Sequence, residues 1–157
     1  MRRLKRRPAA TEAGTWSAER DEALALLRQD ARDARNRVPW GWSGAVLVDA
    51  LLDDGDVDDA WAAAQNVATD PQWRRLADAS ITSRPADALA VYLRAIGSLK
   101  GMTGDQAYRQ MAALLLSARA CHEALGTTGE FKRYLVLFRM EQRRKRNLMK
   151  ILDENGL

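Results

Sequence analysis

The adjacent pair Cys121-His122 contains the residue types that most often act as nucleophile, general base or metal ligand, and the chain has one of each. Zinc needs three or four protein ligands, more than this pair supplies. Neighbouring residues on a helix also point about 100° apart, so the two side chains do not readily share a hydrogen bond. We therefore predict that Cys121 is a small core residue and that His122 lies at the surface or at the edge of a groove.

Alternating acidic residues in the stretch DDGDVDD resemble the first ligands of a calcium-binding loop, with Asp54, Asp56 and Asp58 two positions apart. Such a loop needs glycine at its sixth position and glutamate at its twelfth, where this chain has Asp59 and Gln65. Acidic residues also favour the first turn of a helix, because the helix dipole is positive there. We interpret the stretch as a helix start.

The motifs of common catalytic sites are absent from the sequence. It has no glycine-rich phosphate loop, no serine-centred elbow and no paired histidine and glutamate at metal-binding spacing. The carboxylate pairs lie almost entirely at predicted helix starts. The sequence therefore predicts a protein that is not an enzyme, with no catalytic residue, no metal and no cofactor.

A cationic run near the end of the sequence consists of Arg143, Arg144, Lys145 and Arg146. It lies between two apolar stretches, 131–138 and 148–152, and we expect all of this in one helix that begins at the capping-box pattern of Thr127 and Glu130 and continues to about residue 155. A helix that is polar on all sides for two turns is solvated or projects beyond its neighbours. The run is a solvated segment, or a candidate charged contact for phosphates or for a partner protein.

Two tryptophans, Trp40 and Trp42, flank a glycine in the loop sequence VPWGWSG. They are candidates for a hydrophobic staple that closes the first helical hairpin, or for an exposed aromatic contact with a ligand. Trp61 and Trp73 lie within helical patterns, and we expect both in the core.

The composition is that of a soluble globular chain, with 157 residues, 46% hydrophobic and 29% charged. The net charge of +4 comes from the two ends, because residues 1–7 carry five cations without an acid and residues 139–157 carry six cations against three acids. The remaining residues carry 14 cations and 18 acids, which disfavours a broad nucleic-acid-binding face. No apolar run reaches the roughly 18 residues that cross a bilayer, and a single cysteine suits a reducing compartment, so we expect a cytoplasmic protein.

Helix signals continue along most of the chain, and no segment shows the alternation of a half-buried strand. We predict a basic disordered arm over residues 1–15 and a single α-helical domain over residues 16–157. Capping residues, prolines and glycines divide that domain into about seven helices. The approximate ranges of six of them are 17–37, 43–53, 55–68, 85–99, 103–125 and 127–155, and the remaining helix begins at residue 70.

Three of these helices begin alike, with an acidic residue, then alanine, then a large apolar residue. The aligned pairs are Ala60-Trp61, Ala88-Leu89 and Ala107-Tyr108. Small residues beside large ones allow neighbouring helices to approach closely, which favours stacked antiparallel hairpins in a solenoid of the tetratricopeptide kind. The pairs are not evenly spaced, so a compact helical bundle is the alternative.

Several of these segments in order resemble the C-terminal helical region of bacterial SWIM zinc-finger proteins. The resemblance rests on RPADALAVYLRAIGSL, AYRQMAALLLSARACHEALG, EFKRYL and RRKRNLMKILDENGL, and it covers roughly residues 20–157. It implies a tetratricopeptide-like array that serves as an interaction module. The Cys-x-Cys and Cys-x-His zinc ligands of that family have no counterpart here, so no metal ligand is carried over.

These observations lead to two functional hypotheses. The first is a non-enzymatic helical-repeat module that binds another protein. The alternative is a nucleic-acid-associated protein that uses the basic residues of 2–7 and 143–146 in weak, salt-sensitive contacts. A membrane is not an expected partner.

Overall fold

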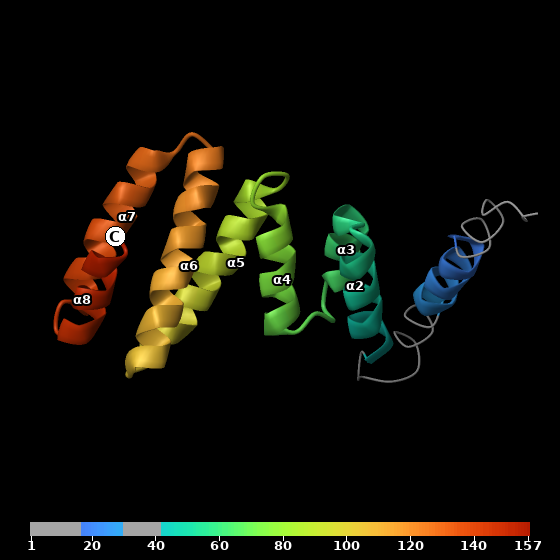
Figure 1. The fold of residues 1–157 in the computed structure, drawn as a ribbon, viewed down its shortest axis with the longest axis horizontal. Helices are drawn as coiled ribbons and strands as arrows, with labels where there is room; N and C mark the ends of the chain where they lie inside the picture. The colour runs from blue at the N-terminus through green and yellow to red at the C-terminus, as the bar shows by residue number, and fades with distance from the viewer. Residues whose placement is uncertain (1–16, 30–41) are drawn as a thin grey trace, which may run out of the picture. The chain divides into compact units, whose positions relative to one another are not determined.

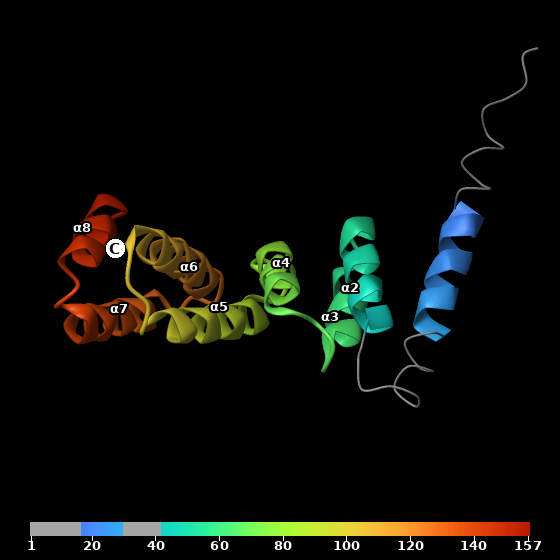
Figure 2. The same cartoon turned by 90° about the horizontal axis from the view of Figure 1, so that it is seen from below.

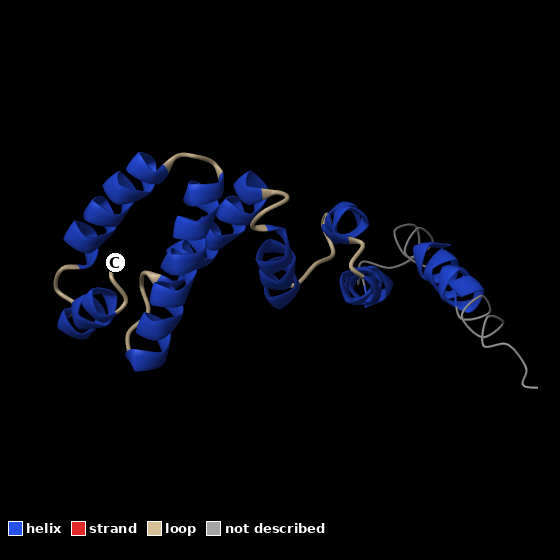
Figure 3. Ribbon diagram, turned by 45° about the horizontal axis from the view of Figure 1, so that its top comes forward, coloured by secondary structure: helices blue, strands red, loops and turns tan. Residues whose placement is uncertain are grey.

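The computed structural model describes residues 17–29 and 42–157, and every regular element within these ranges is helical (Figures 1 and 3). The all-α prediction is therefore confirmed for the described residues. The predicted arm of residues 1–15 and Trp40 lie outside them. The chain divides into two compact units, residues 1–69 and 70–157, and each is described separately.

In the first unit, residues 17–29 form a helix, followed by α2 (Trp42–Asp54) and α3 (Val57–Ala64), which pack together. Helix α2 begins at Trp42, one residue before the start predicted at residue 43, so Ser43 lies inside it. The end of α2 follows from Gly55, whose φ of 80° allows the backbone N–H groups of residues 55 and 56 to bond to carbonyls of the last helical turn. The core of this unit includes Leu24, Leu47, Val48, Leu51, Ala60, Trp61 and Ala64, which confirms the prediction for Trp61.

The second unit contains five helices: α4 (Asp70–Ser80), α5 (Pro85–Leu99), α6 (Asp105–Ala124), α7 (Thr128–Gln142) and α8 (Arg146–Glu154). The predicted proline start of α5 is confirmed, because Pro85 occupies its first turn. Helix α5 packs on α4 and α6, while α6 also contacts α7 and α8 (Figures 1 and 2). Helix α6 is thus the central element of the unit.

Burial on several sides explains the composition of α6. Its buried side chains are Tyr108, Met111, Ala112, Leu114, Leu115, Ala118, Cys121 and His122, which extend around much of the helix because it has neighbours on more than one side. The prediction of a core position for Cys121 is confirmed. Burial raises the pKa of its thiol, which keeps it protonated and disfavours nucleophilic chemistry.

The turn between α6 and α7 confirms one prediction and corrects two. Gly126 has a φ of 70° and ends α6 as expected, with Thr127 N–H bonded to the carbonyl of His122 at 2.8 Å. The Thr127 side chain does not cap α7, because its hydroxyl lies 2.8 Å from Nδ1 of His122. The surface or groove-edge position expected for His122 is wrong, since its ring is buried and lies 5.7 Å from the ring of Phe131.

The single terminal helix expected over residues 127–155 is also wrong, because the chain turns at residues 143–145 between α7 and α8. Both helices bury one side against the unit, with Phe138 and Gln142 buried before the turn and Leu148 and Leu152 buried after it. A straight helix would carry the later apolar residues away from the core. Their burial favours the turn over helical continuity.

A buried tyrosine links α4 and α5. Tyr92 donates a hydrogen bond to Asp78 at 2.6 Å, and its ring is almost fully buried. Burial, followed by the bond to Asp78 and its negative charge, raises the pKa of Tyr92 well above its usual value. The phenol is therefore neutral in the folded protein at pH values where an unfolded tyrosine ionises.

This arrangement predicts a specific weakness at alkaline pH. Unfolded tyrosine ionises at about pH 10, and the pKa of Tyr92 is higher than this in the folded state. The contribution of Tyr92 to the free energy of unfolding is therefore fully present below about pH 10 and decreases as the pH rises above that value. In Tyr92→Phe we expect this fall to be shallower by up to about 1.4 kcal/mol per pH unit. Urea denaturation of both proteins at pH 9 and pH 11 measures the difference. Equal losses in the two proteins would contradict it.

Candidate functional site

The four cations of the predicted charged contact lie at the turn between α7 and α8, where they have different environments. Lys145 is partly buried, whereas Arg143, Arg144 and Arg146 are exposed. Of these three arginines, Arg143 donates a hydrogen bond to the carbonyl of Met140 at 3.1 Å. The run therefore does not form one uniform basic surface.

Lys145 connects the turn to the end of α5. Its Nζ donates hydrogen bonds to the carbonyls of Lys100 at 2.5 Å and Met102 at 2.9 Å, and it lies 5.8 Å from the centre of the Tyr108 ring. Carbonyls at a helix C-terminus lack partners within the helix and carry partial negative charge. Lys145 supplies the missing donor and charge, so its role is structural.

Three further contacts hold the turn in place. Lys100 forms an ion pair with Glu141 at 2.7 Å, and its Nζ lies 5.8 Å from the ring of Phe138. On the other side of the turn, Asn147 donates a hydrogen bond to Asp105 at the start of α6. These contacts fix the direction in which α7 ends.

The side of α7 that faces away from the rest of the unit is apolar and exposed to solvent. Phe131, Phe138 and Gln142 are buried against the unit. Val136, Leu137 and Met140 point away from it, with exposed fractions of 58%, 66% and 58%. Residues three or four positions apart are neighbours on a helix surface, so these three side chains form one patch.

Cations border this patch at both ends. Lys132 and Arg133 lie one turn before it, and Arg143 and Arg144 follow it; all four are exposed. At 100° per residue, the members within α7 occupy an arc of about 140°. We call this surface the outer face of α7, and it comprises Lys132, Arg133, Val136, Leu137, Met140, Arg143 and Arg144.

Sequence reasoning found the two arginines of this face but not its apolar centre. The signal was present in the unbroken apolar run YLVLF at residues 134–138. A helix that packs on one side cannot bury five consecutive side chains, because their directions cover the whole circumference. Such a run on an edge helix therefore indicates an exposed apolar patch.

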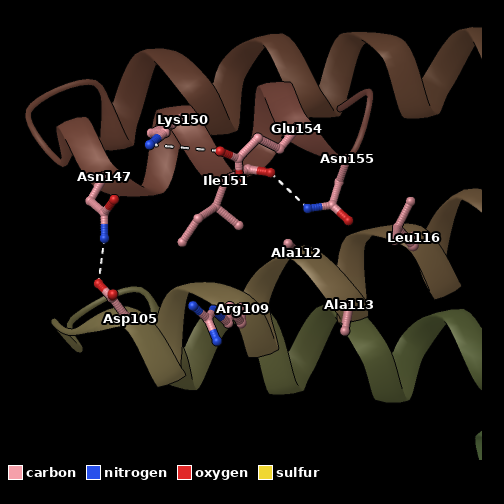
Figure 4. Close-up of a pocket in the computed structure, with 10 residues that line it drawn as sticks. All are labelled: Asp105, Arg109, Ala112, Ala113, Leu116, Asn147, Lys150, Ile151, Glu154 and Asn155. Carbon is pink, nitrogen blue, oxygen red and sulfur yellow. Dashed lines mark hydrogen bonds and ion pairs between the residues drawn. The ribbon is translucent and has the colours of Figure 1, made fainter.

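A groove of about 510 Å³ lies between α6 and α8, and polar or charged side chains form much of its lining (Figure 4). Its charged groups are of both signs, and several are already paired within it. Lys150 lies 3.8 Å from Glu154, and Asn147 is bonded to Asp105, while Arg109 extends along the α6 side. The groove has no excess of one charge that would select an anionic or a cationic ligand.

A smaller groove of about 340 Å³ lies between α4 and α5, and it corrects the expectation for Trp73. This side chain is half-buried at the groove rather than in the core. The Arg94 guanidinium lies 5.5 Å from the centre of its ring, an arrangement that shields the ring face by a cation–π contact.

The remaining sequence candidates are the two tryptophans and the acidic stretch of the first unit. Trp42 begins α2, but its side chain, like all of Trp40, lies outside the described residues. In the acidic stretch, Asp59 forms an ion pair with Arg28 at 2.9 Å, and Asp54 lies 3.6 Å from Arg20. Both contacts lie within the first unit.

Two features of the described residues bear on the possible classes of site. Within residues 17–29 and 42–157, no three histidine, cysteine, aspartate or glutamate side chains gather closely enough to hold a metal ion. None of the helices in these ranges combines the length and the apolar character needed to cross a bilayer.

Comparisons with protein-family models, with curated proteins and with solved structures gave no match for this chain. The resemblance to the helical region of SWIM zinc-finger proteins therefore stays a prediction.

Proposed function

We propose that this chain is a non-enzymatic interaction module that binds another protein through the outer face of α7. One observation carries the proposal, the exposed patch of Val136, Leu137 and Met140. The proposed function includes no catalytic step and no cofactor. A cytoplasmic setting, suggested by the single buried thiol of Cys121, forms part of the same proposal.

The energetic reason is the cost of leaving this patch in water. Covering a side chain of this size contributes roughly 1–2 kcal/mol when about 60% of it is exposed beforehand. Three such side chains beside one another can therefore supply much of the apolar core of a small interface. Single exposed apolar residues are common, whereas a contiguous patch bordered by charges is typical of an interaction site.

A tetratricopeptide-like array is the architecture that we propose for this module, with a compact bundle as the alternative. In the second unit α4, α5, α6 and α7 each pack on the next helix along the chain, which supports a serial arrangement. The contacts of α8 with both α6 and α7 are closer to a bundle. In either architecture α7 presents the same face to solvent.

A nucleic-acid-associated role is the second candidate, and the exposed arginines 143, 144 and 146 favour it. Non-specific affinity for nucleic acid grows with the number of cations that neutralise phosphates. Here Lys145 is engaged with the end of α5, and the cations at the two ends of α7 are separated by the apolar patch. These features favour a protein partner.

The test is site-specific photo-crosslinking in the cells that produce the protein. A photoreactive amino acid at Leu137 is expected to give one or a few discrete adducts with another protein. The matched control is the same amino acid at Ala90, an exposed position on α5. Adduct patterns that are the same at both positions would contradict a docking role for α7.

A further inference from the structure

We infer, on the basis of the proposed function, that the partner of the outer face of α7 is an acidic amphipathic helix of another protein. The inference depends on where the charges lie relative to the apolar patch, on which acids are present nearby, and on the shape of the surface.

The cations form two pairs with the apolar patch between them. Lys132 and Arg133 precede Val136, and Arg143 and Arg144 follow Met140. From Lys132 to the end of α7 at Gln142, ten residues at a rise of 1.5 Å each, the face is about 15 Å long. This length corresponds to about three turns of a partner helix.

These four cations are not neutralised by nearby acids. None of them forms an ion pair with an acidic residue in the part of the chain that the structure describes. Of the two acids on α7, Glu141 pairs with Lys100, whereas Glu130 lies at the exposed start of the helix. The outer face therefore has an uncompensated positive charge, which a complementary partner would meet with carboxylates.

The same charges disfavour a second copy of this chain as the occupant. In a symmetric pair of antiparallel α7 helices, Lys132 and Arg133 of one copy would approach Arg143 and Arg144 of the other. Such like-charge contacts are unfavourable across a desolvated interface. An anionic membrane would also attract the cations, but three apolar side chains form a narrow surface for insertion compared with the broad apolar face of interfacial helices.

A helix is the partner structure that fits this surface best. The patch residues 136, 137 and 140 form short ridges at spacings of three and four residues, which pack into the grooves of another helix. The matching segment would have apolar residues at positions i, i+3 or i+4, and i+7, with glutamate or aspartate at both ends. This pattern places its carboxylates against the two pairs of cations.

The experiment is a display selection on the full chain with a library of helical peptides of about 16 residues, long enough for more than three turns. The library varies charge and apolar spacing independently. We expect acidic sequences with the apolar spacing given above. An enriched peptide is then synthesised, and its affinity is measured for the chain and for each variant described below.

Charge is tested by the double substitution Arg143→Glu and Arg144→Glu, which should weaken binding about tenfold or more at moderate salt. Arg109→Glu reverses an exposed cation of α6 outside this face and should leave affinity unchanged. The apolar patch is tested by Leu137→Ser, which should weaken binding at least about fivefold. Val46→Ser alters an exposed apolar residue of α2 and serves as its control.

Other outcomes would overturn the inference in distinguishable ways. Enrichment of apolar helices without acids, sensitive to Leu137→Ser but not to charge reversal, would exclude an acidic partner and leave the proposed function intact. If no helical peptide is enriched but position 137 gives discrete adducts in cells, the partner is not a helix. The proposed function would then remain. A third outcome is that the chain binds duplex DNA or anionic vesicles, that charge reversal abolishes this binding, and that Leu137→Ser leaves it unchanged. This outcome would overturn both the inference and the proposed function.

Discussion

Phe138→Ala is expected to lower the free energy of unfolding by about 3–5 kcal/mol, the usual cost of removing a buried aromatic side chain. Phe138 is buried where α7 meets the rest of its unit, and Nζ of Lys100 lies over its ring. Its truncation leaves a cavity and removes the ring beneath that ammonium group, which keeps its ion pair with Glu141. The loss is large relative to the total stability of a domain of this size.

The neighbouring residue provides the control. Leu137 is 66% exposed, so Leu137→Ala is expected to change the free energy of unfolding by no more than about 0.5 kcal/mol. Urea denaturation followed by far-ultraviolet circular dichroism measures both values. Similar losses for the two variants would show that α7 is buried on both sides, and the docking surface would then not exist.

Lys145→Met is expected to cost about 1.5–3 kcal/mol, the range for a hydrogen bond that involves a charged group. Methionine keeps most of the apolar stem but cannot donate to the carbonyls of Lys100 and Met102. It also removes the positive charge at the C-terminal end of α5 and the cation–π contact with Tyr108.

Arg144→Met, one residue earlier in the same cationic run, is the matched control. Its side chain is exposed, so we expect a change within about 0.5 kcal/mol. The same urea denaturation applies, with hydrogen exchange of α5 amides as a local measure. A larger loss for Arg144→Met than for Lys145→Met would reverse the structural and exposed roles given to these two residues.

Helix starts and stops were the most predictable part of the fold, because they depend on local chemistry. Pro85 fixes its own backbone angle and suits the first turn of α5. Gly126 and Gly55 end α6 and α2 because they adopt positive φ at little cost. At these positions the residue type and its nearest neighbours in the sequence largely determine where the helix begins or ends.

The turn at residues 143–145 was not predictable in this way. Its residues are compatible with a helix, and the chain turns because the apolar side of α8 packs against α6. Likewise, the burial of His122 depends on Thr127 and Phe131, which approach it only after Gly126 has reversed the chain. Both features come from tertiary packing, which local patterns do not determine.

The candidate site was half predictable for the same reason. The cationic run is visible in the sequence, but the difference between Lys145 and Arg144 depends on the position of the end of α5. The exposed patch on α7 follows from the run YLVLF once α7 is known to pack on one side only. The sequence therefore indicates an excess of apolar residues, and the structure identifies which of them remain exposed.

The most direct test of the central claim compares crosslinking from two positions of α7 and one control in living cells. Photoreactive residues at Leu137 and Met140 are expected to capture the same partner, and the residue at Ala90 is expected not to capture it. Arg143→Glu with Arg144→Glu should reduce the yield at both α7 positions. Two results would contradict the claim that the outer face of α7 is a docking surface. One is capture of this partner at Ala90 with equal yield, and the other is capture of no protein at Leu137 and Met140.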